Sequence, residues 1–152
     1  MKIADFEIGK EKAFIIAELS ANHNGSLDLA VKTIEAAARA GADAVKLQTY
    51  RADTITLNSN DEHFIIKGGS LWDGLTYYQL YDKAYTPWQW HKTLKETADR
   101  LGIILFSSPF DKTAVDFLEE LNVPAYKIAS FEINDLQLIE YISFVSPSLY
   151  IL

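Results

Sequence analysis

Cysteine is absent from the 152-residue sequence, so no disulfide framework holds the fold together. The absence fits a reducing compartment, and it fits many exported proteins as well. No segment approaches the ~20 consecutive apolar residues that a membrane-spanning helix needs. The first residues, Met1–Phe6, also lack the apolar stretch of a signal peptide, so we expect a protein of the cytoplasm.

Positive charge is scarce, because 14 Lys and Arg residues stand against 21 Asp and Glu residues and the net charge is −7. This balance argues against general nucleic-acid binding. It leaves room for a local anion site, since two buried lysines can dominate the potential around them. Hydrophobic residues make up 49% and charged residues 23%, which is the composition of a globular domain.

Apolar runs of the kind that form buried parallel strands recur along the chain. Segments with helical spacing lie between them, and this alternation predicts an α/β fold with a parallel sheet and right-handed crossovers. Met1–Gly9 is expected to form a short strand or hairpin before the sheet. The expected strands begin near residues 14, 44, 103 and 125, and a fifth covers Ser148–Leu152.

Each expected helix has a recognisable start and end. Polar capping residues mark the starts, and glycine or proline marks the stops. One start reads as a capping box with proline at the first helical position. The starts are Ser26, Thr86–Gln89 (the capping box), Asp111 and Asn134–Asp135, and the stops are Gly41, Gly102 and Pro124.

Two architectures fit this order of elements. An eight-stranded βα barrel needs ~250 residues, and the chain supplies about half of one. The alternatives are a doubly wound sheet of about five strands and a partial (βα)8 TIM-type barrel made of the first four to five βα units. Polar residues near the strand ends favour the partial barrel, whose carboxyl-end face carries catalytic residues. The interval from Tyr50 to Tyr85 is too long for a simple connection, and such loops are usually lids or binding loops.

Charged side chains sit inside or at the end of the apolar runs, where they are costly unless paired. Alternate residues of a strand share a face, so Lys46 and Gln48 point the same way. If Glu18 and Lys127 face the same side, the site holds two cations, one anion and an amide, which suits a phosphate or carboxylate ligand. The alternative is a structural ion pair between Glu18 and Lys46. Hydroxyl donors would come from Ser107, Ser108 and Ser130.

Two loops have both a structural and a functional interpretation. Asn22–Gly25 forms either a tight turn into the Ser26 cap or a hydrogen-bonding loop over a substrate. Ser107–Asp111 forms either a strand end and helix cap or a set of hydroxyls beside a helix N-terminus, where an anion binds. Trp72 lies between glycines in the long interval, where packing alone explains an aromatic poorly.

The histidines and the other tryptophans carry weaker signals. His23 has no second ligand in view and is expected to be a hydrogen-bonding group, not a metal ligand. We expect His63 and His91 at the surface or in loops. Trp88 and Trp90 lie on a predicted helix and are expected to serve packing.

Four motifs follow one another along the chain: Ile16–Glu18 followed by Asn22–Gly25, Gly41–Gln48, Phe106–Asp111 and Tyr126–Glu132. In this order they resemble the sialic acid synthase family, over roughly residues 5 to 142. Within that family, the segments Leu71–Gly74, Ala84–Pro87 and Trp90–His91 together with Tyr81 look most like the pseudaminic acid synthase branch. The tail from Phe144 departs from the family's pattern.

The resemblance implies a βα barrel that condenses phosphoenolpyruvate with an N-acetylated amino sugar, makes a nonulosonic acid and releases phosphate. N-acetylneuraminate synthase is the alternative within the family. By motif position Glu18, Lys46 and Lys127 would be catalytic, with both lysines on phosphoenolpyruvate. The substrate-binding residues would be Asn22, Gln48, Trp72, Asp73, Ser107, Ser108, Ser130 and Glu132.

The resemblance also implies a divalent metal, Mn²⁺ or Mg²⁺, and a homodimer at full length. It assigns residues 1–152 to the N-terminal portion of the barrel. The family's metal histidines, the second half of the barrel and a C-terminal antifreeze-like domain would lie outside the chain, which would be inactive alone. Two functions from other classes stay open: a Schiff-base lysine aldolase, and a non-catalytic fragment that binds phosphoenolpyruvate weakly or acts only through association.

Overall fold

Five parallel strands lie side by side in chain order after an N-terminal hairpin in the computed structural model, which describes residues 2–9, 12–145 and 150–151. Both the predicted hairpin and the predicted parallel sheet are confirmed. Ser148, Leu149 and Leu152 of the fifth predicted strand lie outside the described residues. The hairpin is β1 (Lys2–Ile3) and β2 (Phe6–Glu7), and the sheet is β3 (Ile16–Ser20), β4 (Ala44–Thr49), β5 (Ile104–Pro109), β6 (Tyr126–Lys127) and β7 (Tyr150–Ile151).

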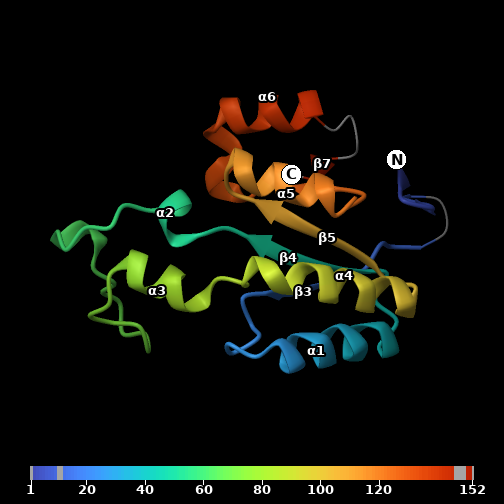
Figure 1. The fold of residues 1–152 in the computed structure, drawn as a ribbon, viewed down its shortest axis with the longest axis horizontal. Helices are drawn as coiled ribbons and strands as arrows, with labels where there is room; N and C mark the ends of the chain where they lie inside the picture. The colour runs from blue at the N-terminus through green and yellow to red at the C-terminus, as the bar shows by residue number, and fades with distance from the viewer. Residues whose placement is uncertain (1, 10–11, 146–149, 152) are drawn as a thin grey trace.

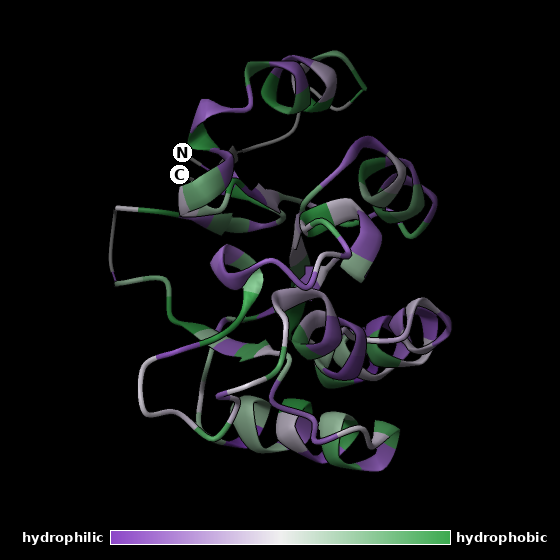
Figure 2. Cartoon of the chain, turned by 90° about the vertical axis from the view of Figure 1, so that its left-hand side faces the viewer, coloured by the Kyte–Doolittle hydropathy of each residue, from purple (hydrophilic) through white to green (hydrophobic). Residues whose placement is uncertain are grey.

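Helices connect successive strands and cover one face of the sheet (Figure 1). Figure 2 looks from the side toward which the strand arrows of Figure 1 point, and there the helices follow an arc around the sheet. A doubly wound sheet would carry helices on both faces, whereas sequential strands with helices on one face form a βα barrel. The partial-barrel prediction is therefore confirmed. The main helices are α1 (Leu27–Arg39), α4 (Trp88–Leu101), α5 (Lys112–Glu120) and α6 (Leu136–Val145).

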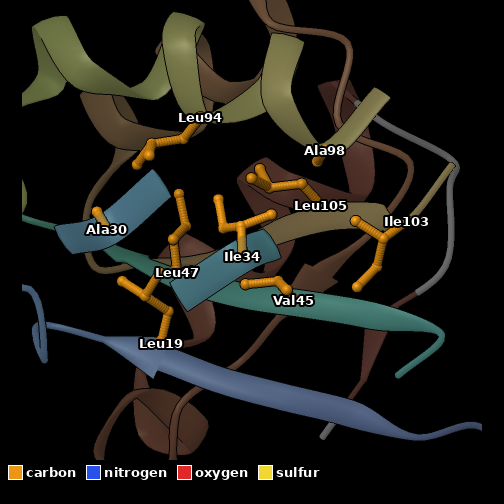
Figure 3. Close-up of a cluster of buried hydrophobic side chains, with 9 residues drawn as sticks. All are labelled: Leu19, Ala30, Ile34, Val45, Leu47, Leu94, Ala98, Ile103 and Leu105. Atoms are coloured by element: carbon orange, nitrogen blue, oxygen red, sulfur yellow. The ribbon is translucent and has the colours of Figure 1, made fainter. Parts of the chain in front are cut away.

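The helix-covered face, called the outer face from here on, is apolar beneath α1 and α4. Val45 and Leu47 of β4 and Leu105 of β5 are almost fully buried against both helices. Figure 3 shows these side chains meeting Ile34 of α1 and Leu94 of α4. Truncating such a leucine to alanine costs ~2–5 kcal/mol. A second outer cluster joins β6 to α5 and α6 through Tyr126, Leu118 and Ile142, among others.

The opposite face, called the inner face, is apolar only at the amino-terminal ends of the strands. Ala44, Phe106 and Ala125 meet there, and Ile3 of the hairpin packs against them with 1% of its surface exposed. Residues farther along the inner face are polar, as the next subsection describes. The hairpin therefore closes one end of the inner face and leaves the carboxyl end free for polar chemistry.

Most predicted helix ends are confirmed. The Ser26 hydroxyl accepts from Leu29 N, and the Asp111 carboxylate accepts from Thr113 N and Ala114 N. Gly102 ends α4 in the left-handed conformation. The capping box at Thr86 is wrong, because the Thr86 hydroxyl donates to the Ser20 carbonyl instead. No helix in the described part of the chain is long and apolar enough to cross a membrane.

The interval between Tyr50 and Tyr85, predicted to be a long loop, contains regular structure. A capping box does occur here, because Thr76 accepts from Gln79 N and the Gln79 side chain accepts from Thr76 N. These elements lie beyond the strand arrowheads, at the carboxyl end of the sheet (Figure 1). They are α2 (Ala52–Ile55), the 3-10 turn η1 (Glu62–Phe64) and α3 (Tyr77–Ala84).

Candidate active site

Lys46 and Glu18 face each other across neighbouring strands, on the inner face. The pairing of β3 with β4 places them opposite one another. The ammonium lies 2.7 Å from Oε1 and 2.6 Å from Oε2 of the carboxylate. Lys46 is 8% exposed, whereas the Glu18 side chain is about half exposed. Because a buried ammonium needs a partner, this pair holds Lys46 in place, and one side of the carboxylate stays open to a ligand.

A bulge shapes the strand that carries Glu18. The register shifts between Glu18 and Ser20, and Ser20 has a φ of 49°. The Ser20 hydroxyl donates to the Glu18 carboxylate. Bulges re-aim side chains at barrel rims, so the local distortion fixes the carboxylate at the strand end.

Three polar side chains form a row one step beyond Lys46 on the inner face. Gln48 pairs with Ser108, and the pairing of Ser107 with Tyr126 puts Lys127 at the level of Ser108. The Ser108 hydroxyl is buried and has no hydrogen-bond partner among the described residues. An unpaired buried hydroxyl costs ~1–3 kcal/mol. The row is therefore incomplete until a ligand or water supplies that bond.

The two lysines share the inner face and the same end of the sheet, as expected for a common site, but β5 separates their strands, so β4 and β6 are not neighbours. Ser108 of β5 lies in the strand between the two lysines. A ligand that met both ammonium groups would have to cross this serine.

A cavity of about 600 Å³ opens at this end of the sheet. This volume is within the ~300–1,000 Å³ range of small-molecule sites. Burial raises the pKa of Glu132, and the nearby Lys127 charge partly offsets that rise. Glu132 Oε2 is buried without a hydrogen-bond partner among the described residues. The lining residues are Gln48, Tyr50, Ile55, Thr56, Tyr77, Tyr81, Phe110, Lys127, Ala129, Ser130, Phe131 and Glu132.

Ser107 does not join this group, because it lies on the outer face. Its hydroxyl is 2.7 Å from Thr49 Oγ1, which is 2.9 Å from His91 Nε2. His91 is fully buried in α4, so its predicted surface position is wrong. Burial lowers the pKa of His91 to about 4 and keeps the ring neutral. His63, in contrast, is exposed as predicted.

Asp73 organises its own loop. Its carboxylate accepts bonds from the backbone N–H groups of Gly68, Gly69 and Ser70 and from the Ser70 hydroxyl. These bonds lower the pKa of Asp73 to about 2. Trp72 is 46% exposed and lines a separate cavity of about 550 Å³. Neither residue lines the cavity that contains Lys127.

Asn22 and His23 border that second cavity together with Trp72. Asn22 is exposed. The His23 ring is buried, lies 5.2 Å edge-on from Trp90, and accepts from Gly25 N through Nδ1. Burial lowers the pKa of His23. The segment forms a tight turn into the Ser26 cap, and His23 is a hydrogen-bonding group, as the sequence predicted. Its Nε2 is buried without a partner among the described residues, so a role of this loop toward a ligand in the second cavity stays a prediction.

Sequence reasoning missed the aromatic residues of the cavity and the Thr49–His91 contact. Tyr77 and Tyr81 have helical spacing after a Thr-x-x-Gln capping box, a pattern that predicts a helix with both tyrosines on one face. Across residues 2–9, 12–145 and 150–151, no group of three or more His, Cys, Asp or Glu side chains is placed to hold a metal ion. These residues do not fit the metal that the resemblance implies.

The family model described as "NeuB family" matches residues 33–151. The chain belongs to the NeuB family. It is 56% identical over 143 residues to the pseudaminic acid synthase of Campylobacter jejuni serotype O:2, covering 94% of this chain and 41% of that protein. It is 56% identical over 126 residues to the Helicobacter pylori enzyme of the same name, covering 83% and 37%. The chain thus spans about two fifths of these curated relatives.

Solved structures agree with the fold. An N-acetylneuraminic acid synthetase from Leptospira borgpetersenii, crystallised with citrate, superposes with a TM-score of 0.81 at 30% identity, covering 99% of this chain and 47% of that one. The spore coat polysaccharide biosynthesis protein SpsE of Bacillus subtilis gives 0.73 at 34% identity, covering 95% and 37%.

Proposed function

We propose that the chain forms the phosphoenolpyruvate-binding part of a nonulosonic acid synthase of the pseudaminic type. The observation that carries the proposal is the buried, unpartnered Ser108 hydroxyl on the inner face, in one row with Lys127, which lines the cavity of about 600 Å³. A trianionic substrate needs cations and hydroxyl donors, which Lys127 and Ser108 supply. The 56% identity to pseudaminic acid synthases, against 33% to an N-acetylneuraminate-9-phosphate synthase, favours the pseudaminic branch.

The proposed reaction forms one carbon–carbon bond. The enol carbon of phosphoenolpyruvate attacks the aldehyde carbon of the N-acetylated amino sugar, and the aldehyde oxygen takes up a proton. Water adds to the cationic carbon that results, and phosphate leaves with cleavage of its C–O bond. Lys46 and Lys127 bind the carboxylate and phosphate, and Ser108 and Ser130 donate to phosphate. Glu18 orients the water or stabilises the developing positive charge.

The remaining roles are proposed with the same reaction. Gln48 touches the sugar, and Glu132 supports the site from the cavity wall. Asn22 and Trp72 lie around the neighbouring cavity, and Asp73 shapes the loop that carries Trp72. Ser107 acts only indirectly, through the strand that carries Ser108.

Three further properties belong to the proposal for the longer protein. It depends on Mn²⁺ or Mg²⁺, it forms a homodimer, and it works in the cytoplasm. The described residues do not provide the metal ligands, so the roles above are assigned to this chain's side chains without a metal-dependent step. Loss of activity with a chelator and its return with Mn²⁺ test the first property.

The function is tested with a chimera in which this chain replaces the matching segment of the C. jejuni pseudaminic acid synthase. We expect phosphate release that requires both phosphoenolpyruvate and the amino sugar. Lys46→Ala should lower kcat/KM for phosphoenolpyruvate by ~10- to 100-fold, the value of a charge-assisted bond to a buried anion. The exposed Lys32→Ala on α1 is the matched control. If melting temperature and activity fell together in Lys46→Ala, Glu18–Lys46 would be only a structural ion pair.

A Schiff-base aldolase would behave differently in the same assay. Borohydride with pyruvate would trap a covalent adduct on lysine, and turnover would proceed without phosphate release. The synthase proposal expects no adduct.

A further inference from the structure

The residues that line the cavity beside Lys127 form two chemically different groups. Gln48, Lys127 and Glu132 are polar, whereas Tyr50, Tyr77, Tyr81 and Phe110 are aromatic. Sites for small molecules combine an apolar wall with a few convergent polar groups, so the two groups suit two different parts of the bound reactants.

The four aromatic residues form a connected wall, defined here as Tyr50, Tyr77, Tyr81 and Phe110. Tyr77 and Tyr81 are four residues apart on α3, so they share a helix face. Their rings are stacked with centroids 6.3 Å apart and an interplanar angle of 23°. Tyr81 meets Tyr50 edge-on at 5.6 Å, and Tyr50 meets Phe110 edge-on at 5.5 Å. These contacts fix the ring orientations.

Packing alone explains Tyr50 but not the two tyrosines of α3. Tyr50 is 3% exposed, whereas Tyr77 is 39% exposed while it lines the cavity. No residue of α3 except its cap, Thr76, is fully buried in the core. The aromatic surface of Tyr77 and Tyr81 thus faces open space at the site.

The hydroxyl groups of the wall add hydrogen-bonding capacity. Burial raises the pKa of Tyr50 to about 12 and also raises the pKa of Tyr81. Neutral phenols both donate and accept hydrogen bonds. An apolar face with neutral polar tips matches a sugar, whose C–H groups and hydroxyls alternate around the ring. It matches a trianion poorly.

We propose that Tyr77 and Tyr81 form the acceptor-sugar platform of the site and that α3 determines sugar specificity. The inference rests on the proposed function, because it needs a sugar acceptor. It places the specificity determinant of the Tyr50–Tyr85 interval on α3, and not at Trp72 and Asp73, which do not line this cavity.

The test uses the 152-residue chain and two probes, the amino-sugar substrate of the C. jejuni pseudaminic acid synthase and phosphoenolpyruvate, observed by saturation-transfer-difference NMR. The variants are Tyr77→Leu/Tyr81→Leu, the conservative Tyr81→Phe, and Tyr78→Leu. Tyr78 is the matched control, because it also lies on α3 but lines a different cavity of about 300 Å³. Far-UV circular dichroism checks that each variant keeps its secondary structure.

We expect sugar ring-proton signals to fall at least fivefold in the double variant and to persist in Tyr81→Phe and Tyr78→Leu. Phosphoenolpyruvate signals should stay unchanged throughout. Sugar signals that survive the double variant, or that never appear while phosphoenolpyruvate binds, overturn the platform and leave the proposed function standing. If neither ligand gives a signal with the wild-type chain, both the platform and the proposed function are wrong.

Discussion

Adjacent serines at the end of β5 have opposite surroundings. On the outer face, the Ser107 hydroxyl belongs to a closed chain with Thr49 and His91. On the inner face, the Ser108 hydroxyl is equally buried but has no partner among the described residues. The comparison shows that a polar residue near a strand end does not by itself mark a binding site. The completeness of its hydrogen bonds separates a structural position from a ligand-binding one.

The same contrast holds for the charged groups. Lys46 is held by both oxygens of Glu18, whereas the Lys127 ammonium makes no side-chain hydrogen bond or ion pair within the described ranges, although its charge partly offsets the rise that burial causes in the pKa of Glu132. Lys46 is thus positioned before a ligand arrives, because its partner is part of the fold. Lys127 remains free to follow the ligand. A site with one fixed and one adaptable cation can bind an anion without a large reorganisation.

The open inner face predicts the largest effect. Made alone, the 152-residue chain should release no measurable phosphate from phosphoenolpyruvate and an amino sugar, even with Mn²⁺. It should also self-associate, because β3 pairs only with β4 among the described strands and Ile15 beside it is 53% exposed. Sizing chromatography and a phosphate-release assay check both points. A stable monomer with turnover would contradict them.

The closed outer face predicts a pH effect. His91 has a folded pKa of about 4, below its ordinary value of 6.5, because of burial. The unfolded chain therefore binds a proton that the folded chain excludes between these values. Stability from this group is complete above pH 6.5 and falls by about 3 kcal/mol as pH drops to 4, since each pKa unit is worth about 1.36 kcal/mol.

His91→Leu tests this effect by urea titration at several pH values. The variant should be ~1 kcal/mol less stable at pH 7.5, where a hydrogen bond is lost. Its free energy of unfolding should fall less steeply than that of the wild type between pH 6.5 and 4. Identical pH slopes would mean that His91 is not held neutral.

The smallest expected effect concerns the loop around Asp73. Asp73→Ala removes four hydrogen bonds to residues 68–70, so hydrogen exchange there should accelerate. Because the carboxylate is exposed, global melting should hardly change. Asp73→Asn, which keeps one acceptor oxygen, is the matched control. A large drop in the melting temperature of Asp73→Ala would show that the loop supports the fold.

Local signals in the sequence predicted most of the fold. The caps at Ser26 and Asp111 and the alternation within β4 depend on neighbouring residues, so they could be recognised from the chain alone. The contact of Thr86 could not be recognised in this way, because the Ser20 carbonyl that accepts the hydrogen bond of its hydroxyl lies 66 positions earlier. The burial of His91 could not be recognised either, because its partner Thr49 lies on β4, 42 positions earlier.

The candidate site was only partly predictable for the same reason. The sequence indicated that Glu18, Lys46 and Lys127 would lie at one end of the sheet, because charged side chains inside apolar strands are costly unless they are paired. The sequence did not show which of Ser107 and Ser108 faces the site. Ser107 shares a strand face with Leu105 and Ser108 with Phe106, and because both of these residues are apolar, either face could have packed against the helices. The aromatic wall comes from three separate segments, and no local pattern joins them.

The serine pair offers the most direct measurement of the central claim, which is that the inner face binds phosphoenolpyruvate and the outer face supports the fold. In the chimera, Ser108→Ala should raise KM for phosphoenolpyruvate by ~10-fold or more, as expected for a lost bond to an anion, with an unchanged or higher melting temperature, because it removes a buried unpaired hydroxyl. Ser107→Ala should lower the melting temperature and leave this KM within about twofold, since it removes only an internal bond. Equal KM values in the two variants, or a larger rise in Ser107→Ala, would contradict the claim.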